Sequence, residues 1–277
     1  MNHVRKVVLL CMPLSVLLLA AERGYPAFEQ LAMGARPAAM AGAYVGFAQG
    51  PEGLLVNPAG IAAATGLTGV AFFSRPFGLK ELDASGFSLF YPLRYGGVGA
   101  AARFFGRSPY QEQVFSLGLG MVVTPHVYVG ASGHLFRLSI ASYGSASTAG
   151  LDLGVLMTVT YNVRWGVTVH NINRPRIGEC KEQLPQVFAT GVSITPAPPL
   201  VVTVDLYKDV RYPAELRIGG SYRPLAPLAL RCGLQSNPGR FSGGIGLWVG
   251  LVRVDYAAGY HYDLGVTHSV SVTVGME

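Results

Sequence analysis

The residue types that carry catalytic chemistry are present in this chain, but they do not fall into a catalytic pattern. Residues 86–90 begin like the Gly-x-Ser-x-Gly turn of serine hydrolases and fail at the last position. The glycines at 244, 246 and 250 lack the spacing of a dinucleotide-binding loop. The six histidines form no His-x-x-x-His pair, and the cysteines form no Cys-x-x-Cys pair. We therefore expect no catalytic residue, no metal site and no cofactor, and a protein that is not an enzyme.

Charged residues alternate with apolar ones along stretches rich in Val, Leu and Tyr. Asp205, for example, lies between Val204 and Leu206, and successive residues of a strand point to opposite faces. This phase predicts that the following ionisable residues face an interior: Asp152, Arg164, His170, Asp205, Glu215, Arg217, Arg231, Arg253 and Asp255. An unpaired buried charge costs several kcal/mol, so we expect pairing, with Asp205 on Arg217 of the next strand. Such charges either fill the interior as a network or guide a solute through it.

The segments that must position these charges read as strands from residue 66 onward, separated by Gly, Pro and Asn turns. We expect about fourteen strands, an even number, as a closed antiparallel barrel requires. Their expected ranges are 66–77, 83–92, 97–106, 112–123, 127–138, 149–160, 163–171, 186–195, 199–208, 214–223, 227–236, 240–249, 251–260 and 266–276. Tight turns alternate with longer loops at 107–111, 140–148 and 173–186. One rim of the barrel is therefore expected to carry short turns and the other long loops.

Composition separates two kinds of sheet protein. Of the 277 residues, 50% are hydrophobic and only 13% are charged, about half the charged share of a typical soluble domain. Beyond the first residues no stretch offers the roughly 18 uninterrupted apolar residues of a membrane helix. A soluble sandwich would turn its apolar faces inward, and a membrane barrel turns them outward. The low charge and the aromatic residues near strand ends, such as Tyr128, Tyr161 and Tyr260, favour an all-β, transmembrane antiparallel β-barrel.

Residues 1–21 have the features of a secretory signal peptide. Arg5 and Lys6 precede an apolar run at 7–19, which ends in Ala20 and Ala21, where cleavage is expected. A membrane anchor is the alternative, but the run is short and contains a proline. Export followed by barrel assembly predicts a location in the outer membrane.

Residues 22–65 are expected to form a small helical hatch, or plug, inside a barrel made by residues 66–277. One helical segment begins at Pro37 and runs to residue 41, because proline suits a first helical position. A second covers 57–64, with Asn57 as its cap. Between these two segments, the glycines and the proline at 46–53 are expected to break any longer helix. A surface loop with two helical turns is the alternative. The residues expected to matter in the hatch are Arg36, Met40, Gly42, Asn57, Pro58 and Gly60.

Two parts of the chain resemble a known superfamily. ARPAAMAGAYV at 35–45, followed by VNPAG at 56–60, resembles the hatch of FadL-type outer-membrane transporters, and still more that of the PorV/PorQ-like proteins of the same superfamily. In the last strands, Leu-Arg-Cys-Gly at 230–233, Asp-Tyr-Ala at 255–257 and Leu-Gly at 264–265 resemble the closing strands of the PorV/PorQ-like proteins. The chain departs from both relatives in its short length and in its non-aromatic end at Met276 and Glu277.

The resemblance implies two alternative functions. A PorV/PorQ-like protein would be a non-catalytic component of type IX-like protein export, with secretion-system proteins or exported cargo as partners. A FadL-like protein would allow passive transport of small hydrophobic molecules across the outer membrane. The closing strands favour the first function, and the second is the alternative. Either protein would be surrounded by outer-membrane lipid, and the absence of a basic run argues against nucleic acid as a partner.

Overall fold

Residues 27–29, 34–64 and 66–275 are described by the structure, a computed structural model. The predicted signal peptide, the first part of the hatch range and Met276 and Glu277 lie outside the described residues. The barrel strands are β1 (Thr68–Arg75), β2 (Ala84–Leu93), β3 (Gly96–Arg107), β4 (Tyr110–Thr124), β5 (Val127–Ile140), β6 (Gly144–Thr160), β7 (Val163–His170), β10 (Val187–Ala197), β11 (Leu200–Asp209), β12 (Glu215–Leu225), β13 (Leu228–Gln235), β14 (Arg240–Val249), β15 (Val252–His261) and β16 (Gly265–Gly275).

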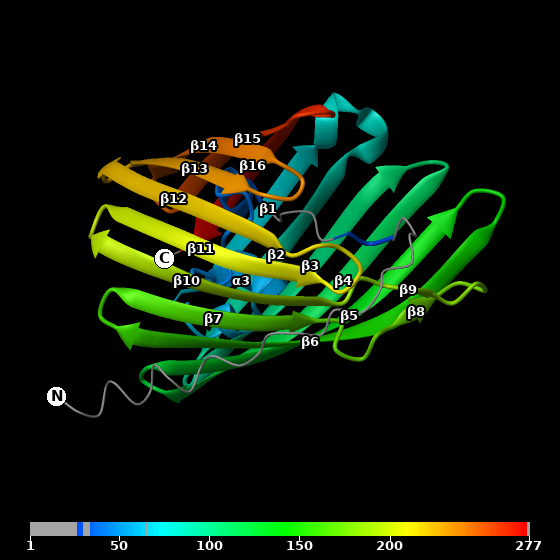
Figure 1. Cartoon of the computed structure of the whole chain (residues 1–277). Coiled ribbons are helices and arrows are strands. Elements are labelled where there is room, and N and C mark those ends of the chain that lie inside the picture. The colour runs from blue at the N-terminus through cyan, green and yellow to red at the C-terminus, as the bar shows by residue number, and fades with distance from the viewer. Residues whose placement is uncertain (1–26, 30–33, 65, 276–277) are drawn as a thin grey trace.

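These fourteen strands form one closed antiparallel barrel, which confirms the predicted fold class (Figure 1). Each strand pairs with the next barrel strand in the chain, and β1 closes the ring on β16, with Thr68 opposite Gly275. Two short strands, β8 (Arg176–Ile177) and β9 (Glu182–Gln183), form a separate small sheet in the long connection between β7 and β10.

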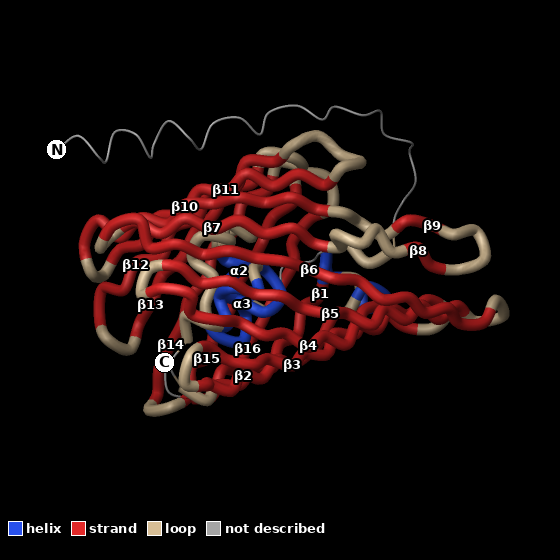
Figure 2. The backbone as a smooth tube through the Cα atoms, turned by 90° about the horizontal axis from the view of Figure 1, so that it is seen from below, coloured by secondary structure: helices blue, strands red, loops and turns tan. Residues whose placement is uncertain are grey.

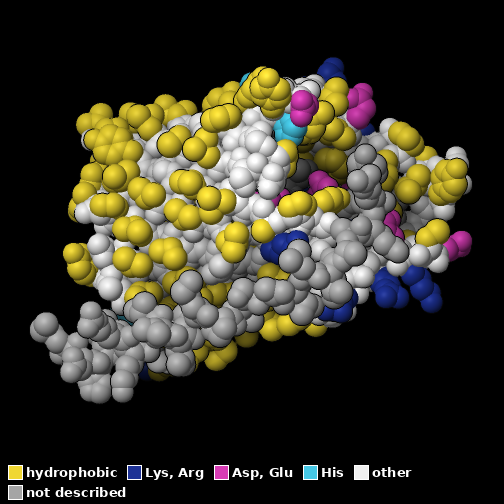
Figure 3. Space-filling view, in the orientation of Figure 1, with side chains coloured by type: hydrophobic (Ala, Val, Ile, Leu, Met, Phe, Trp, Pro, Cys, Tyr) yellow, Lys and Arg dark blue, Asp and Glu magenta, His cyan; other side chains and the backbone are white. Residues whose placement is uncertain are grey.

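The barrel wall is apolar on the outside and polar on the inside. Along β16, Val270, Val272 and Val274 are 41%, 39% and 52% exposed, whereas Ser271 and Thr273 between them are buried. This is the pattern of a wall that faces lipid on one side and a filled lumen on the other. Hydrophobic side chains accordingly cover most of the visible wall, and charged ones gather toward the end with the long loops (Figure 3). Among the described residues, no helix combines the length and apolarity needed to cross a membrane.

The two rims differ in their connections. Two-residue turns join β2 to β3, β4 to β5, β6 to β7, β10 to β11, β12 to β13 and β14 to β15 at what we call the short-turn rim. The opposite, long-loop rim carries the connections at 76–83, 171–186, 210–214 and 236–239. Short turns are periplasmic and long loops extracellular in barrels of the outer membrane.

Two predicted loops were wrong in extent. Residues 107–111 and 140–148 form only tight turns, because β4, β5 and β6 continue to pair beyond the barrel wall to Ile140 opposite Gly144. Small alternating Ser, Ala and Thr residues at 145–148 concealed this strand. Conversely, the loop at 76–83, with the 3₁₀ turns η2 (Pro76–Gly78) and η3 (Lys80–Leu82), was missed.

The hatch lies inside the barrel (Figure 2). Its elements are α2 (Ala35–Ala39), α3 (Gly50–Val56) and the 3₁₀ turn η1 (Pro58–Ile61). The short helix α3 was not predicted, and it forms although glycines and a proline lie at 46–53. Pro51 falls in the first turn, where no N–H is needed, and the buried Leu54 and Leu55 pack the helix against the wall. The helix predicted for 57–64 is shortened to one 3₁₀ turn.

Inward-facing glycines let the hatch touch the wall directly. A Cβ atom at Gly130 would lie 2.3 Å from the carbonyl carbon of Pro58, and one at Gly233 would lie 2.3 Å from that of Met40. No side chain fits there unless the hatch moves. We call the wall glycines that face the hatch in this way the glycine belt: Gly120, Gly130, Gly154, Gly166, Gly219, Gly233 and Gly244.

Candidate functional site

Five buried ionised side chains connect the hatch to the wall on one side of the barrel. Glu52 of α3 lies 3.6 Å from Arg36 of α2 and 3.4 Å from Arg253 of β15. Asp255 accepts hydrogen bonds of 2.7 Å from both Arg253 and Arg231. We call these five residues the latch. Breaking one member of a buried ion pair leaves an uncompensated charge, so the latch resists displacement of the hatch.

Asp205 of β11 is a second point at which the wall holds the hatch. It is 1% exposed, and its Oδ2 accepts a 2.7 Å hydrogen bond from the backbone N–H of Val45. The expected pair with Arg217 is not formed, although the two residues are register partners on β11 and β12. Arg217 instead donates to Glu215 on its own strand at 2.7 Å and stacks over the ring of Tyr207. Glu215 shares the inward face with Arg217, and the N–H group of Val45 engages Oδ2 of Asp205.

A polar cluster in the wall formed by β4 to β7 includes two of the predicted interior residues. Asp152 Oδ2 lies 2.6 Å from His170 Nδ1 and 2.9 Å from His134 Nε2. The other nitrogen of His134 lies 2.7 Å from Ser116 Oγ, and Asp152 also accepts from the N–H of Asn171. His134 and Ser116 were missed, because nothing in the sequence brings β4, β5 and β6 together at this level.

The order serine, histidine, aspartate in this cluster is that of a hydrolase triad. The hollow beside it has a volume of only about 30 Å³ and is lined by Phe28 and Leu55, which leaves little room for a substrate against Ser116. We interpret the cluster as a hydrogen-bonded brace of the wall. The described residues contain no group of three or more His, Cys, Asp or Glu side chains that could hold a metal ion.

The remaining predicted residues also lie where hatch and wall meet. Arg164 donates a 3.4 Å hydrogen bond to the carbonyl of Ala48. Gly60 packs on the same residue, since its Cβ would fall 2.8 Å from the carbonyl carbon of Ala48. Gly42, at a φ of 77°, leaves room for the guanidinium of Arg217.

Asn57 is the polar residue that ties the second half of the hatch together. Its Oδ1 accepts from the N–H of Ala59, while its Nδ2 donates to the carbonyls of Val45 in the hatch and Val155 in the wall. The side chain is fully buried. Asn57 therefore caps η1 and also bridges hatch and wall.

We expect Asn57→Ala to loosen the hatch without unfolding the barrel. The lost cap costs about 1 kcal/mol, and each buried carbonyl left without a donor adds about 1–3 kcal/mol. Single-channel recordings of the wild type are expected to be mostly closed, and the variant is expected to open more often. Asn173→Ala, at an exposed position of the long-loop rim, is the matched control. Equal open times for Asn57→Ala and the control would show that Asn57 does not hold the hatch.

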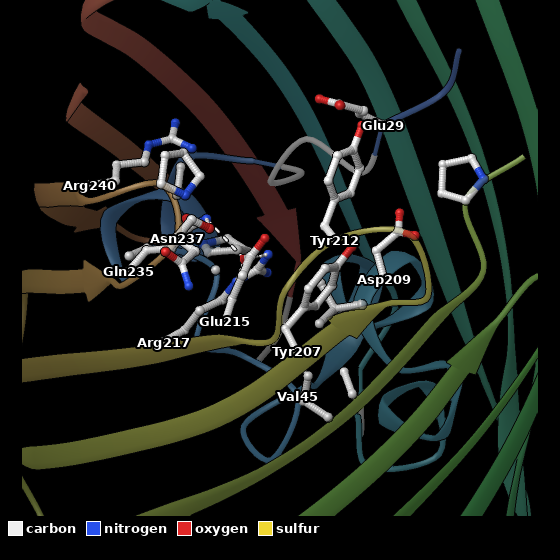
Figure 4. Close-up of a pocket in the computed structure, with 18 of the residues that line it drawn as sticks. Glu29, Val45, Tyr207, Asp209, Tyr212, Glu215, Arg217, Gln235, Asn237 and Arg240 are labelled. Carbon is white, nitrogen blue, oxygen red and sulfur yellow. Dashed lines mark hydrogen bonds and ion pairs between the residues drawn. The ribbon is translucent and has the colours of Figure 1, made fainter. Parts of the chain in front are cut away.

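A cavity of about 580 Å³ lies between the hatch and the long-loop rim. We call it the vestibule (Figure 4). Its floor is made by small and apolar hatch residues, and its sides by aromatic and polar residues of the wall and loops. The floor includes Ala38 and Ala41, and the sides include Phe77, Tyr207, Tyr212, Glu215, Arg217, Gln235 and Arg240. Of these, sequence analysis found only Glu215 and Arg217.

Two acidic groups outside the membrane-spanning strands shape the mouth of the vestibule. The carboxylate of Asp83 accepts hydrogen bonds from Arg75 at 2.8 Å and from Arg107 at 2.9 Å. These bonds hold the 76–83 loop, which carries Phe77, in place. The hydrogen bond from Arg75 holds the pKa of Asp83 below its usual range. Glu29 lines the vestibule, and its burial raises the pKa of its carboxyl against the opposing attraction of Arg211.

Comparison with known proteins gives a fold but no family by sequence. No protein-family model matches the chain, and no curated protein matches it either. Several solved structures share the fold. The CymD monoaromatic hydrocarbon channel superimposes with a TM-score of 0.64 at 14% identity, over 91% of this chain and 99% of CymD. The Ralstonia pickettii toluene transporter TbuX superimposes with a TM-score of 0.61 at 14% identity, over 88% of this chain and 97% of TbuX. A Pseudomonas aeruginosa FadL homologue superimposes with a TM-score of 0.61 at 11% identity, over 87% of this chain and 98% of the homologue.

These structures have a FadL-like fold, as the hatch sequence predicted. They do not test the finer resemblance to PorV/PorQ-like proteins, which stays a prediction.

Proposed function

We propose that this chain is an outer-membrane channel that admits small, largely apolar molecules into the vestibule from the outside and releases them when the hatch or the wall yields. The observation that carries the proposal is the vestibule itself. It is large enough for a small organic molecule, lies on the long-loop side of the hatch, and has an apolar floor. A barrel that served only as a rigid anchor would not need such a cavity.

The contacts of the hatch define what transport requires. The latch, Asp205 and Asn57 hold the hatch, and the glycine belt leaves it no clearance from the wall. A solute that reaches the floor of the vestibule therefore cannot pass while the hatch stays in place. Transport is expected to be passive and gated, because no described group suggests coupling to an energy source.

Uptake by whole cells tests the proposal. A strain without its own hydrocarbon channels would express the protein, and entry of radiolabelled toluene through the outer membrane would be measured. Ala38→Trp is the informative variant, since residue 38 is half-buried on the vestibule floor and a large ring there fills the cavity. We expect the wild type to raise the initial uptake rate several-fold and Ala38→Trp to abolish that increase.

The control is Tyr161→Trp, which places the same ring on the exposed short-turn rim and is expected to transport like the wild type. Uptake no faster than in cells without the protein, with normal amounts of folded barrel, would contradict a transport function. A defect in surface delivery of exported proteins on deletion of the gene would then favour the secretion function.

A further inference from the structure

Arg240 is a cation in the vestibule without a partner of its own. It is the first residue of β14, is only partly exposed, and lines the vestibule. Its side chain lies across Gly259 of β15, where a Cβ would be 3.1 Å from Nε. Within the described ranges, no hydrogen bond or ion pair joins the side chain of Arg240 to another residue. The charges that act on it come from Arg217, which repels it, and Glu215, which attracts it.

Glu215 makes no hydrogen bond or ion pair with Arg240, and its carboxylate engages Arg217 and Gln235 instead. Its Oε2 accepts from Arg217 Nη2 at 2.7 Å and from Gln235 Nε2 at 3.0 Å. A partly desolvated guanidinium next to a second guanidinium gains from an added anion. A carboxylate fits this role best, because it can accept two parallel hydrogen bonds from the planar fork of arginine.

The vestibule is polarised, which gives such an anion an orientation. In Figure 4, Arg240 lies on one side together with the ion pair of Arg217 and Glu215, and Glu29 and Asp209 lie on the other. Asp209 is paired with Arg211 at 2.9 Å, so it does not compete for Arg240. The carboxylate of a ligand is therefore attracted to the arginine side and is kept from the acidic side.

The body of the ligand would meet rings and small side chains. Tyr207 and Tyr212 stand between the two charged sides in Figure 4, and Phe77 comes from the 76–83 loop. Aromatic faces and edges interact favourably with another aromatic ring, in addition to the burial of area. Ala38 and Ala41 of the hatch give a flat floor on which a ring can lie.

From these contacts we infer that the vestibule binds a compact aromatic carboxylate, with the carboxylate on Arg240 and the ring against Tyr207, Tyr212 and the hatch floor. The inference rests on the proposed function, because it names the class of molecule that the vestibule of the channel selects.

Calorimetry on the full-length protein in detergent at neutral pH tests the inference with three probes. These are 4-ethylbenzoate, its neutral isostere 4-ethylbenzamide, and the aliphatic anion octanoate. We expect the wild type to bind 4-ethylbenzoate about tenfold or more tightly than the amide, a difference of about 1.4 kcal/mol, and more tightly than octanoate. Arg240→Gln is expected to remove the preference for the benzoate and to leave amide binding unchanged, whereas Arg240→Lys keeps most of it.

Arg94→Gln is the matched control, since Arg94 is an exposed arginine of the short-turn rim, and it is expected to bind like the wild type. Equal affinity of the wild type for benzoate and amide, or a preference that survives Arg240→Gln, would overturn the inference. Octanoate binding as tightly as the benzoate would overturn its aromatic part. Toluene uptake without benzoate selectivity would refute this inference alone. Arg240-dependent benzoate binding in a protein that transports neither toluene nor the benzoate would refute the proposed function alone.

Discussion

Val204→Arg is expected to prevent assembly of the barrel in the membrane. Val204 is 41% exposed on the outer face of β11, whereas Asp205 next to it is buried in the lumen. An arginine on the lipid face costs about 2–4 kcal/mol near the midplane. Native barrels migrate faster than heated ones on a gel, so loss of the heat-modifiable band and of fractionation with outer membranes would report the failure.

Two controls separate the position from the substitution. Val204→Leu keeps an apolar residue on the lipid face and is expected to assemble normally. Tyr161→Arg adds an arginine at a residue that is 98% exposed on the short-turn rim, and it is also expected to assemble. If Val204→Arg assembles as well as both controls, the outer face assigned to β11 is wrong, and the predicted interior charges lose their basis.

Gly130→Val is expected to displace the hatch while the wall still closes. The new Cβ would fall 2.3 Å from the carbonyl carbon of Pro58 and 2.4 Å from the backbone nitrogen of Ala59. Backbone atoms cannot yield as a flexible side chain does, so η1 must move. Overpacking of this kind costs about 1–3 kcal/mol, which falls on the contact between hatch and wall. Planar-bilayer recordings are expected to show a larger and more persistent conductance than those of the wild type.

Gly133→Val is the matched control on the same strand. Gly133 faces outward, and a Cβ there meets only the side chain of Leu151 at 3.8 Å, an ordinary contact. This variant is expected to conduct like the wild type. A closed Gly130→Val channel with a correctly assembled barrel would mean that the hatch can shift within the lumen without opening a path, and the glycine belt would then have no role in sealing it.

The wall could be predicted from the sequence, because the alternation of apolar and polar residues along a strand indicates which of its faces meets lipid. All fourteen barrel strands were expected close to their observed positions, and β16 shows why: Val270, Val272 and Val274 alternate with small polar residues. The pattern weakens where a hairpin leaves the membrane, as at residues 144–148, because neither face must then be apolar.

The interior could be predicted only as a set of inward positions, because pairing depends on contacts between distant segments. Asp205 and Arg217 were expected to pair from their place on neighbouring strands, but a backbone N–H of the hatch engages the first and Glu215 the second. Arg240 and His134 carry no local signal of their own. The short helix α3 was not predicted for a tertiary reason, since buried leucines outweigh the weak helix propensity of glycine there.

The hatch also has a consequence for the order in which the chain folds. The seam of the barrel joins β1 to β16, segments separated by nearly the whole sequence, and such non-local closure is slow because the loop entropy must be overcome first. The hatch directly precedes β1 and touches the last strands, through Glu52 to Arg253 on β15 and through the N–H of Ala35 to Ser271 on β16. It can therefore gather the two ends of the chain before they pair, so the segment that blocks the finished pore also acts as the template on which the pore is closed.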